Sequence, residues 1–362
     1  MDLSVVIPVK DGAPTIRAAV ESLLAQDFEG IYEVIVVVDR DDASCDALAD
    51  LVGDERLVVL HSDPFPVPGA RDSNWRRCAG VAASRGTWIA FVDADMVFPL
   101  DWARRAVARL DAVDCVAGTV RSVDGYGFWG RYVDRNTLAA KTPRFTTRRL
   151  LTKASLGRRG CKPPITANFI FSRAVVETVG PPRPDVTYNY DDYAFCQEIV
   201  DAGFEILCDP ELAGRHHHRQ GLRALINEYR NSGRGCGQFV RLYPHSVLAR
   251  RRRCHLYACV AAGVALVTTL ALAPLAALVT VALVLSVLGL AQLVTLRTPE
   301  STLYPAITGL LGSAFVCGFA YEHLFGEPVP VWWEGPIASV PRADREIVID
   351  LVAEEVRETT DA

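Results

Sequence analysis

Two hydrophobic patterns divide the chain. Over roughly the first 220 residues, short β-rich runs alternate with segments of helical periodicity, whereas the C-terminal third holds long uncharged stretches. The β-rich runs cover residues 3–9, 33–39, 56–60, 87–93 and 114–120. Strands that alternate with helices predict a layered α/β domain around a largely parallel sheet.

The uncharged stretches predict membrane helices. Residues 256–296 contain no Asp, Glu, Lys or Arg, and as one helix they would extend roughly 60 Å, about twice the hydrocarbon core of a bilayer. Pro274 divides this run, so we expect two transmembrane helices with a turn at this proline. A second uncharged run between Glu300 and Glu322 predicts a third transmembrane helix over 301–323. The alternative is a buried helical core in a soluble protein, which is rarely so long and uncharged all round.

Positive charge gathers just before these helices. Ten arginines lie between positions 215 and 253 against one acidic residue, and four of them are consecutive at 250–253. Cytoplasmic loops of membrane proteins are enriched in Lys and Arg, so 246–255 is expected to be a basic juxtamembrane segment that contacts anionic headgroups. We therefore expect a multi-pass protein of the plasma membrane with its N-terminal domain in the cytoplasm. A solvated basic face without a specific partner is the alternative.

The C-terminal residues, the net charge and the cysteines indicate further properties of the chain. Residues 324–362 begin with a proline-rich stretch that contains Trp332 and Trp333 and end in acidic residues, which predicts an interfacial loop and an acidic tail. The net charge of -5 over 362 residues gives no global basic field, so no nucleic-acid partner is expected. Ten cysteines without CxxC spacing are expected to be reduced thiols and not zinc ligands or disulfides. The sequence carries no signal for the oligomeric state.

Acidic residues follow several of the predicted strands. Asp93 and Asp95 come at the end of one run, and Asp39 comes at the end of another. Ligands of such sheets bind at the carboxyl ends of the strands. Two close carboxylates stay ionised when a cation lies between them, and Mg²⁺ or Mn²⁺ favours carboxylate and phosphate oxygens. An Asp-rich turn that caps the next helix is the alternative for this pair.

The order of these features resembles glycosyltransferase family 2, the inverting enzymes of GT-A fold, over about residues 1–245. The matching positions are Pro8 and Val9 after the first strand, Asp39 after the second, Arg77 and Gly80 in a helix, Gly86, and Asp93-Ala94-Asp95. The resemblance implies that Pro8 and Val9 line the nucleobase pocket and that Asp39 hydrogen-bonds the base. It also implies that Arg77 and Asp93 contact the nucleotide and that the Asp pair holds the metal.

The resemblance also implies a domain plan and a set of ligands. A Rossmann-like GT-A domain would cover 1–245, with a nucleotide-binding half over about 1–120 and an acceptor half over about 121–245, followed by the C-terminal transmembrane helices. The donor would be a nucleotide-diphosphate sugar, for which we expect a UDP-sugar, together with Mg²⁺ or Mn²⁺. The acceptor would be lipid-linked or a cell-envelope glycan.

The expected catalytic base lies later in the chain. Asp191-Asp192 begins a predicted helix, and a glycine, a short strand, a proline and His216 follow in the family's order. Asp192 resembles the base, since a carboxylate can take the proton from an attacking hydroxyl. Asp191 is expected to cap the helix or contact the acceptor, and helix capping is the alternative for both acids. His216 is expected to contact the metal or diphosphate, with an exposed surface histidine as the alternative.

The chain departs from the family pattern at several positions. Lys10-Asp11 stands where an aromatic-Asn pair is common, and Arg76-Arg77-Cys78 stands where Ala-Arg-Asn is usual. The Gln-x-x-Arg-Trp motif of processive synthases is missing, so transfer of a single sugar is expected. Two other functions stay open at this point, a nucleotidyltransferase with a similar metal-carboxylate edge and a non-enzymatic membrane scaffold.

Overall fold

A computed structural model of the chain describes residues 2–30, 32–39, 42–62, 72–123, 127–136, 145–183, 186, 188–218 and 221–326. These residues fall into two compact units, one formed by Met1–Arg121 with Pro143–His217 and the other by Ser122–Thr142 with His218–Pro328. The predicted interfacial loop and acidic tail lie outside the described residues from position 327 onward, Trp332 and Trp333 included. The domain boundary expected at residue 245 stays a prediction.

The first unit is built on one mixed sheet, in which the described residues form nine strands in the order β3-β2-β1-β4-β8-β6-β9-β5, with β7 paired to β9. The strands are β1 (Leu3–Pro8), β2 (Tyr32–Asp39), β3 (Leu57–Ser62), β4 (Trp88–Val92), β5 (Met96–Val97), β6 (Cys115–Ser122), β7 (Arg149–Leu151), β8 (Asn168–Ser172) and β9 (Ile206–His216). β1 to β4 pair in parallel, as the sequence predicted, whereas β4–β8, β6–β8, β5–β9 and β7–β9 are antiparallel. The hydrophobic pattern of a strand does not encode the direction of its neighbour, so this second half was not foreseen.

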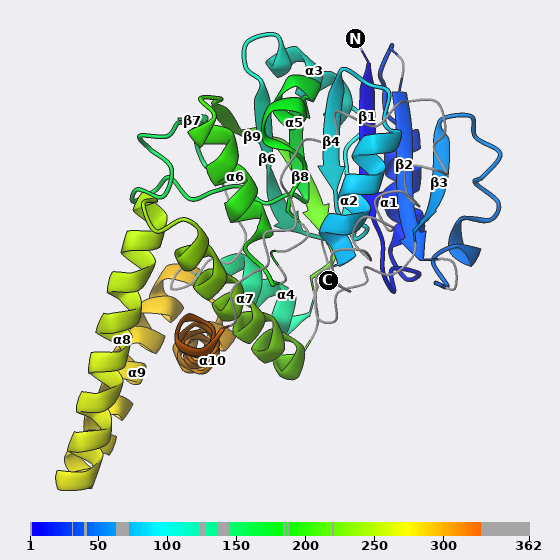
Figure 1. Ribbon diagram of the computed structural model, residues 1–362. Helices are drawn as coiled ribbons and strands as arrows, with labels where there is room; N and C mark the ends of the chain where they lie inside the picture. The colour runs from blue at the N-terminus through cyan, green and yellow to red at the C-terminus, as the bar shows by residue number, and fades with distance from the viewer. Residues whose placement is uncertain are drawn as a thin grey trace. The chain divides into compact units, whose positions relative to one another are not determined.

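Helices cover both faces of this sheet (Figure 1). They are α1 (Ile16–Leu24), α2 (Asp72–Ala83), α3 (Trp102–Leu110), α5 (Arg173–Val179) and α6 (Asp191–Asp201), with the short η1 (Asp46–Leu48). Val5 and Ile7 of β1 pack into one hydrophobic core with α1 and α3, whereas Val6 packs into another with α2, α5 and α6. This alternation is the period of a strand whose two faces are both buried. The result is a three-layer α/β/α unit.

A glycine lets α2 lie close to the sheet. A Cβ atom at Gly80 would overlap the side chain of Val6 in β1. Since α2 follows β3, its first turns lie near the carboxyl ends of the parallel strands. Gly80 therefore brings Arg76 and Arg77, one turn earlier in α2, close to the acidic residues at those strand ends.

The second unit is helical. It contains α4 (Phe128–Arg135), α7 (Leu222–Leu242), α8 (Val247–Leu272), α9 (Pro274–Leu296), η2 (Pro299–Leu303) and α10 (Tyr304–Phe325). α8 ends at Leu272 and α9 begins at Pro274, as the sequence predicted. By length and composition, the described part of the chain has three helices able to cross a membrane, Val247–Leu272, Pro274–Leu296 and Pro299–Phe325. These apolar helices indicate membrane association.

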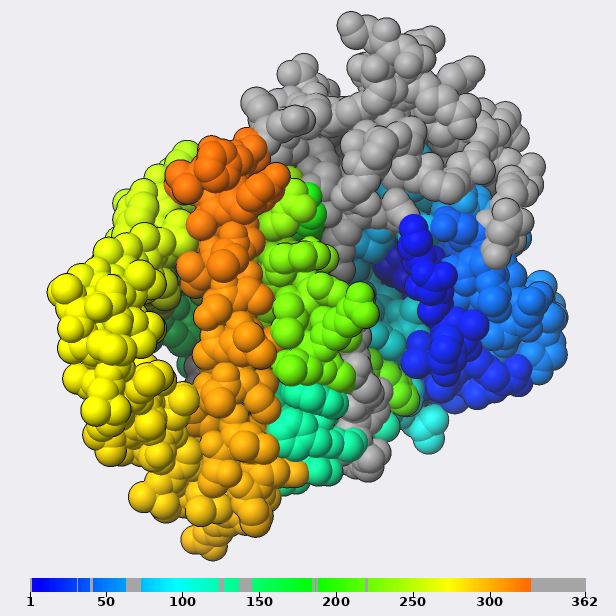
Figure 2. Space-filling view, turned by 90° about the horizontal axis from the view of Figure 1, so that it is seen from below, coloured from blue at the N-terminus to red at the C-terminus, as the bar shows by residue number. Residues whose placement is uncertain are grey.

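α7 and α10 pack with their backbones in close contact, and Figure 2 shows them side by side. A Cβ atom at Gly318 would overlap the carbonyl group of Arg230. The carboxylate of Glu322, which is buried, lies 3.2 Å from Nε of Arg234 and 2.9 Å from Nη2 of Arg241. Small residues at the contact and paired charges beside it therefore hold the two helices together.

A larger side chain at position 318 should separate α7 from α10. We expect Gly318→Leu to destabilise the helical unit by about 1–3 kcal/mol, as overpacking commonly does. Thermal unfolding of the detergent-solubilised chain, followed by size-exclusion chromatography, measures the effect. Gly309→Leu in the same helix is the matched control, because a Cβ atom there meets no atom of the described residues within 4 Å. Equal melting temperatures for the two variants would contradict this account of the packing.

Candidate functional site

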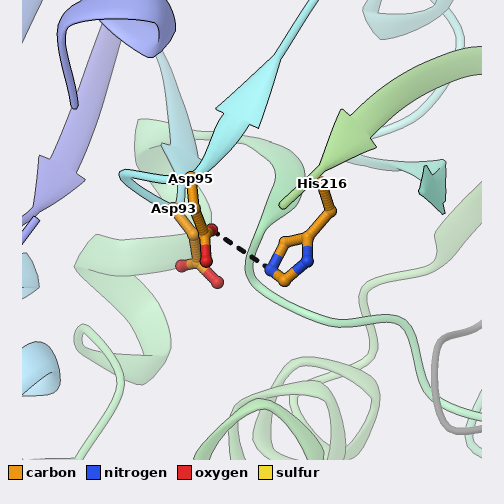
Figure 3. Close-up of side chains that lie close together, drawn as sticks. All are labelled: Asp93, Asp95 and His216. Atoms are coloured by element: carbon orange, nitrogen blue, oxygen red, sulfur yellow. Dashed lines mark ion pairs between the residues drawn. The ribbon is translucent and has the colours of Figure 1, made fainter. Parts of the chain in front are cut away.

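Three side chains gather where strands of the sheet end (Figure 3). Asp93 and Asp95 follow β4, and His216 is the last residue of β9. Ligand atoms of the three lie within 4.8 Å of one another, and Nε2 of His216 is 3.1 Å from Oδ1 of Asp95. The antiparallel pairing of β5 with β9 sets Met96 opposite His216, and the amide of His217 donates to the carbonyl of Asp95 at 2.9 Å. Backbone pairing thus holds the histidine against the two acids.

The donor set of this cluster suits a divalent cation. The two carboxylates suit Mg²⁺ or Mn²⁺, and the imidazole adds a nitrogen ligand of the kind that transition metals accept. All three side chains are partly exposed, so an ion can reach them from solvent. The structure therefore brings together the three residues, Asp93, Asp95 and His216, that the sequence predicted as metal ligands.

The guanidinium of Arg77 connects this cluster to α6. Its Nη2 donates to Oδ1 of Asp93 at 2.9 Å, and its Nη1 donates to Oδ2 of Asp191 at 3.1 Å and to Oδ1 of Asn74 at 2.8 Å. The group also lies 5.8 Å from the centre of the Phe91 ring. Arg77 is only 4% exposed, so the two carboxylates compensate a charge that is removed from water. The sequence predicted a nucleotide contact here, and the structure places this side chain between Asp93 and Asp191.

The neighbouring arginine pairs with the acid at the end of β2. Nη2 of Arg76 lies 2.5 Å from Oδ1 of Asp39, and Arg76 is 1% exposed whereas the Asp39 side chain keeps 21% of its surface. Arg76 stands where glycosyltransferase family 2 usually has alanine. This departure is the feature of the sequence that could have indicated the ion pair with Asp39. The arrangement fixes one oxygen of Asp39 and leaves the other side of the carboxylate accessible.

The loops after β1 and β2 are tied to each other. Asp42 accepts hydrogen bonds from the Asp11 amide at 2.7 Å and the Ser44 hydroxyl at 2.6 Å, and the Gly12 amide donates to Ser44 Oγ at 3.0 Å. Burial favours a higher pKa for Asp42, but the hydrogen bonds from Ser44 and the Asp11 amide outweigh it and lower the pKa. Asp11 itself has a φ of 52°, in the left-handed region. Residues 40–41 of the predicted acidic loop lie outside the described residues.

The two residues predicted to line the nucleobase pocket begin this turn. Pro8 ends β1, and Val9 is buried in the hydrophobic core on the α1 side of the sheet. The amide of Val9 donates to the carbonyl of Val37 in β2 at 2.9 Å. Pro8 and Val9 therefore fix the start of the loop that leads to Asp11.

Asp191 and Asp192 begin α6, as predicted, but their surroundings differ. Asp191 is buried against Arg77, whereas Asp192 is partly exposed and accepts a hydrogen bond from the Tyr193 amide at 2.8 Å. The preceding residue, Tyr190, has a φ of 102°, a conformation that costs a non-glycine residue about 1–3 kcal/mol. Its ring packs 4.2 Å from that of Tyr193. No sequence pattern signals this strained turn, which we did not foresee.

Comparisons with known proteins agree on one family. Residues 4–180 match the sequence profile of Glycosyl transferase family 2. The chain is 30% identical over 230 residues to the succinoglycan biosynthesis protein ExoO of Rhizobium meliloti, covering 61% of this chain and 62% of that protein. It is 26% identical over 236 residues to the glycosyltransferase AglE of Haloferax volcanii, covering 63% of this chain and 71% of that protein. The match thus spans less than two thirds of the length of ExoO.

Solved structures of the same fold extend the comparison to the helices. The mannosyltransferase PcManGT of Pyrobaculum calidifontis, solved in complex with GDP-Man and Mn²⁺, superposes with a TM-score of 0.60 at 18% identity over 90% of this chain and 88% of that one. Residues 1–349 of TarS of S. aureus, solved with UDP, superpose with a TM-score of 0.50 at 16% identity over 89% and 90%. At these identities the likeness establishes a GT-A-like α/β fold followed by long apolar helices.

Loss of one carboxylate should weaken cation binding. We expect Asp95→Asn to reduce Mn²⁺ affinity at least about tenfold, because a neutral amide replaces a charged ligand. Isothermal titration of the purified chain with MnCl₂ measures this. The control is Asp111→Asn, which removes an exposed acid outside the cluster. Unchanged Mn²⁺ affinity in Asp95→Asn would show that these residues do not hold the ion.

Removal of the Arg77 charge should destabilise the first unit. Arg77→Gln leaves the buried Asp191 without its cation, and breaking such a pair commonly costs about 3–5 kcal/mol. Arg17→Gln is the matched control, because its pair with Asp50 is exposed and such pairs contribute about 0–1 kcal/mol. Urea unfolding followed by tryptophan fluorescence measures both variants. Similar stability losses in the two would contradict a special role for Arg77.

Proposed function

This chain belongs to glycosyltransferase family 2, and from that membership we propose that it is an inverting enzyme that transfers one sugar from a nucleotide-diphosphate sugar. The observation that carries the proposal is the cluster of Asp93, Asp95 and His216, which Arg77 connects directly to the Asp191-Asp192 start of α6. A cation site for a diphosphate and a carboxylate for an acceptor are the two elements that this reaction needs.

The pair formed by Asp39 and Arg76 supports a donor nucleotide whose nucleobase carries an N–H group on its pairing edge. Asp39 pairs with Arg76 and is partly exposed, so its carboxylate oxygens can accept a hydrogen bond from a ligand. Uracil and guanine present such an N–H group, and the related folds of TarS and PcManGT were solved with UDP and GDP-Man. We propose a UDP-sugar as the donor, with Pro8 and Val9 shaping the turn beside the base.

Asp93, Asp95 and His216 would hold Mg²⁺ or Mn²⁺, which supplies positive charge to the departing diphosphate. Asp93 is additionally held by Arg77, so its orientation does not depend on the ion. The partly exposed positions of these side chains leave access for phosphate oxygens.

Asp192 is proposed as the general base. Its carboxylate takes the proton of the acceptor hydroxyl while that oxygen forms a bond to the anomeric carbon and the bond to the diphosphate oxygen breaks. A single displacement of this kind inverts the anomeric configuration. Asp191 is buried in its pair with Arg77 and positions the start of α6, so the more exposed Asp192 suits the base role.

The apolar helices support an acceptor at a membrane. We propose that the protein is anchored in the plasma membrane with the catalytic domain on the cytoplasmic side, because the arginine run 250–253 immediately precedes the uncharged part of α8. A lipid-linked or cell-envelope glycan acceptor would then be held at the same surface as the enzyme.

A donor screen tests the proposal. UDP-, GDP- and TDP-sugars with Mn²⁺ are scored by thermal shift, since a bound ligand raises the melting temperature by mass action. The best donor is then followed by release of nucleoside diphosphate in membranes that supply acceptors. Activity that needs the metal supports the proposal. Release of pyrophosphate from a nucleoside triphosphate would favour a nucleotidyltransferase instead, and the absence of any nucleotide binding would favour a scaffold.

Substitution of the base should separate catalysis from binding. We expect Asp192→Asn to lower kcat by about 10²–10⁴, the usual contribution of general base catalysis, with little change in donor affinity. Steady-state kinetics and donor titration measure the two quantities. Asp111→Asn, at an exposed position, should retain both. A kcat in Asp192→Asn near that of the unmodified chain would remove Asp192 from the mechanism.

A further inference from the structure

The path of α10 through the helical unit is fixed at three points. Near its start, a Cβ atom on Gly289 in the last turns of α9 would lie 2.9 Å from the carbonyl oxygen of Thr302. Near its middle, the ring of Phe315 lies 6.0 Å below the guanidinium of Arg252, close to the start of α8. Near its end, Glu322 pairs with Arg241, the penultimate residue of α7. α10 therefore runs from the end of α9 past the start of α8.

These contacts place α10 across one end of a hairpin. α8 and α9 are consecutive helices that turn at Ala273, so the start of α8 and the end of α9 lie at the opposite end from that turn. The arginines 250–253 lie at this same open end. Figure 1 looks down the axis of α10 while α8 and α9 are seen lengthwise. α10 is thus crosswise to the hairpin and does not run beside it.

A polar helix accompanies α10 along its length. Leu225 of α7 belongs to the same hydrophobic cluster as Leu311, and further along Gly233 faces Phe315 and Gly237 faces Glu322. The two helices have 21 and 22 residues, so each is roughly 32 Å long. Exposed positions of α7 carry Arg223, Asn227, Arg230 and Asn231.

The charge on α7 argues against a third crossing. If α10 crossed the bilayer, α7 would share its depth, and Arg223 and Arg230 would face hydrocarbon, which is costly for exposed charges. If only the hairpin crosses, all these arginines stay at the level of the headgroups. The exposed apolar side of α10, with Leu310, Tyr321 and Leu324, would then dip into the interface, as in helices that lie in the membrane plane. The burial of the apolar residues agrees, since the buried share of the 18-residue apolar window is 28% in the third candidate span against 6% and 17% in the first two.

We propose that α8 and α9 cross the membrane as a hairpin and that α7 and α10 lie together in the plane of its cytoplasmic surface. The lipid surface is the partner of the exposed side of α10, and anionic headgroups meet the arginines 250–253. This inference rests on the membrane anchoring proposed above and not on the transferase activity. It replaces the third transmembrane helix that hydropathy predicts over 301–323, and it puts the end of α10 at Phe325 on the cytoplasmic side.

Reporter fusions to the full chain in bacterial cells test the topology. Alkaline phosphatase is active only outside the cytoplasm, and green fluorescent protein exported in the unfolded state is fluorescent only inside. We expect a reporter fused after Ala362 to be fluorescent as green fluorescent protein and inactive as phosphatase. A phosphatase domain inserted between Ala273 and Pro274 should be active, because this turn lies outside.

Each outcome decides the question. An active phosphatase at both positions would establish three crossings and overturn the in-plane assignment of α10. An inactive phosphatase at the turn would show that the hairpin does not cross, which overturns the anchoring premise whatever the enzyme's activity. A second measurement avoids large fusions, with Ala273→Cys and Ala362→Cys labelled by a membrane-impermeant maleimide in intact cells. We expect labelling of the first position above the background of the unmodified chain, and labelling of the second only after permeabilisation.

Discussion

The buried charge of Arg77 is the constraint on which the site depends. A guanidinium removed from water requires anionic partners. The partners of Arg77 are Asp93, which follows β4, and Asp191, which comes 114 residues after Arg77 in the chain. The close approach of α2 to β1 at Gly80 brings the arginine to this position. The proposed cation cluster and the start of α6 are therefore parts of one electrostatic unit, and a movement of either would leave a buried charge without its partner.

The sequence predicted the elements of the site but not the connections between them. Strand periodicity followed by Asp39 or Asp93 is sufficient to place acids at the carboxyl edge of a sheet, because parallel strands end together. The direction of β8 and β9 is not encoded in their hydrophobic pattern, so the approach of His216 to Asp95 through the β5–β9 pairing required the structure. The pair of Arg76 with Asp39 and the left-handed turn at Tyr190 likewise arise from tertiary packing, which overrides local preferences.

In the helical unit, hydropathy identifies apolar helices but does not predict how each lies relative to the bilayer. Length and composition identify α8, α9 and α10 equally, and the turn at Pro274 is visible in the sequence because proline cannot continue the preceding helix. Neither the length nor the composition of a helix determines its orientation relative to the bilayer. That direction depends on what packs beside it, and for α10 the neighbour is α7, whose exposed side is polar. Small residues such as Gly318 suit contact with this neighbour as well as they suit contact between two membrane helices.

The Arg77 contact also bears on how firmly a cation would be held. Asp93 gives one oxygen to Arg77, so part of its negative charge is compensated before any ion arrives. Asp95 contributes a second carboxylate and His216 an imidazole nitrogen, so the three side chains offer the ion few ligand atoms. A divalent cation would therefore have coordination positions left over, and hard cations of this kind commonly complete their ligand sets with substrate phosphates. Since a diphosphate would supply those remaining ligands, cation and donor are expected to bind more tightly together than either does alone.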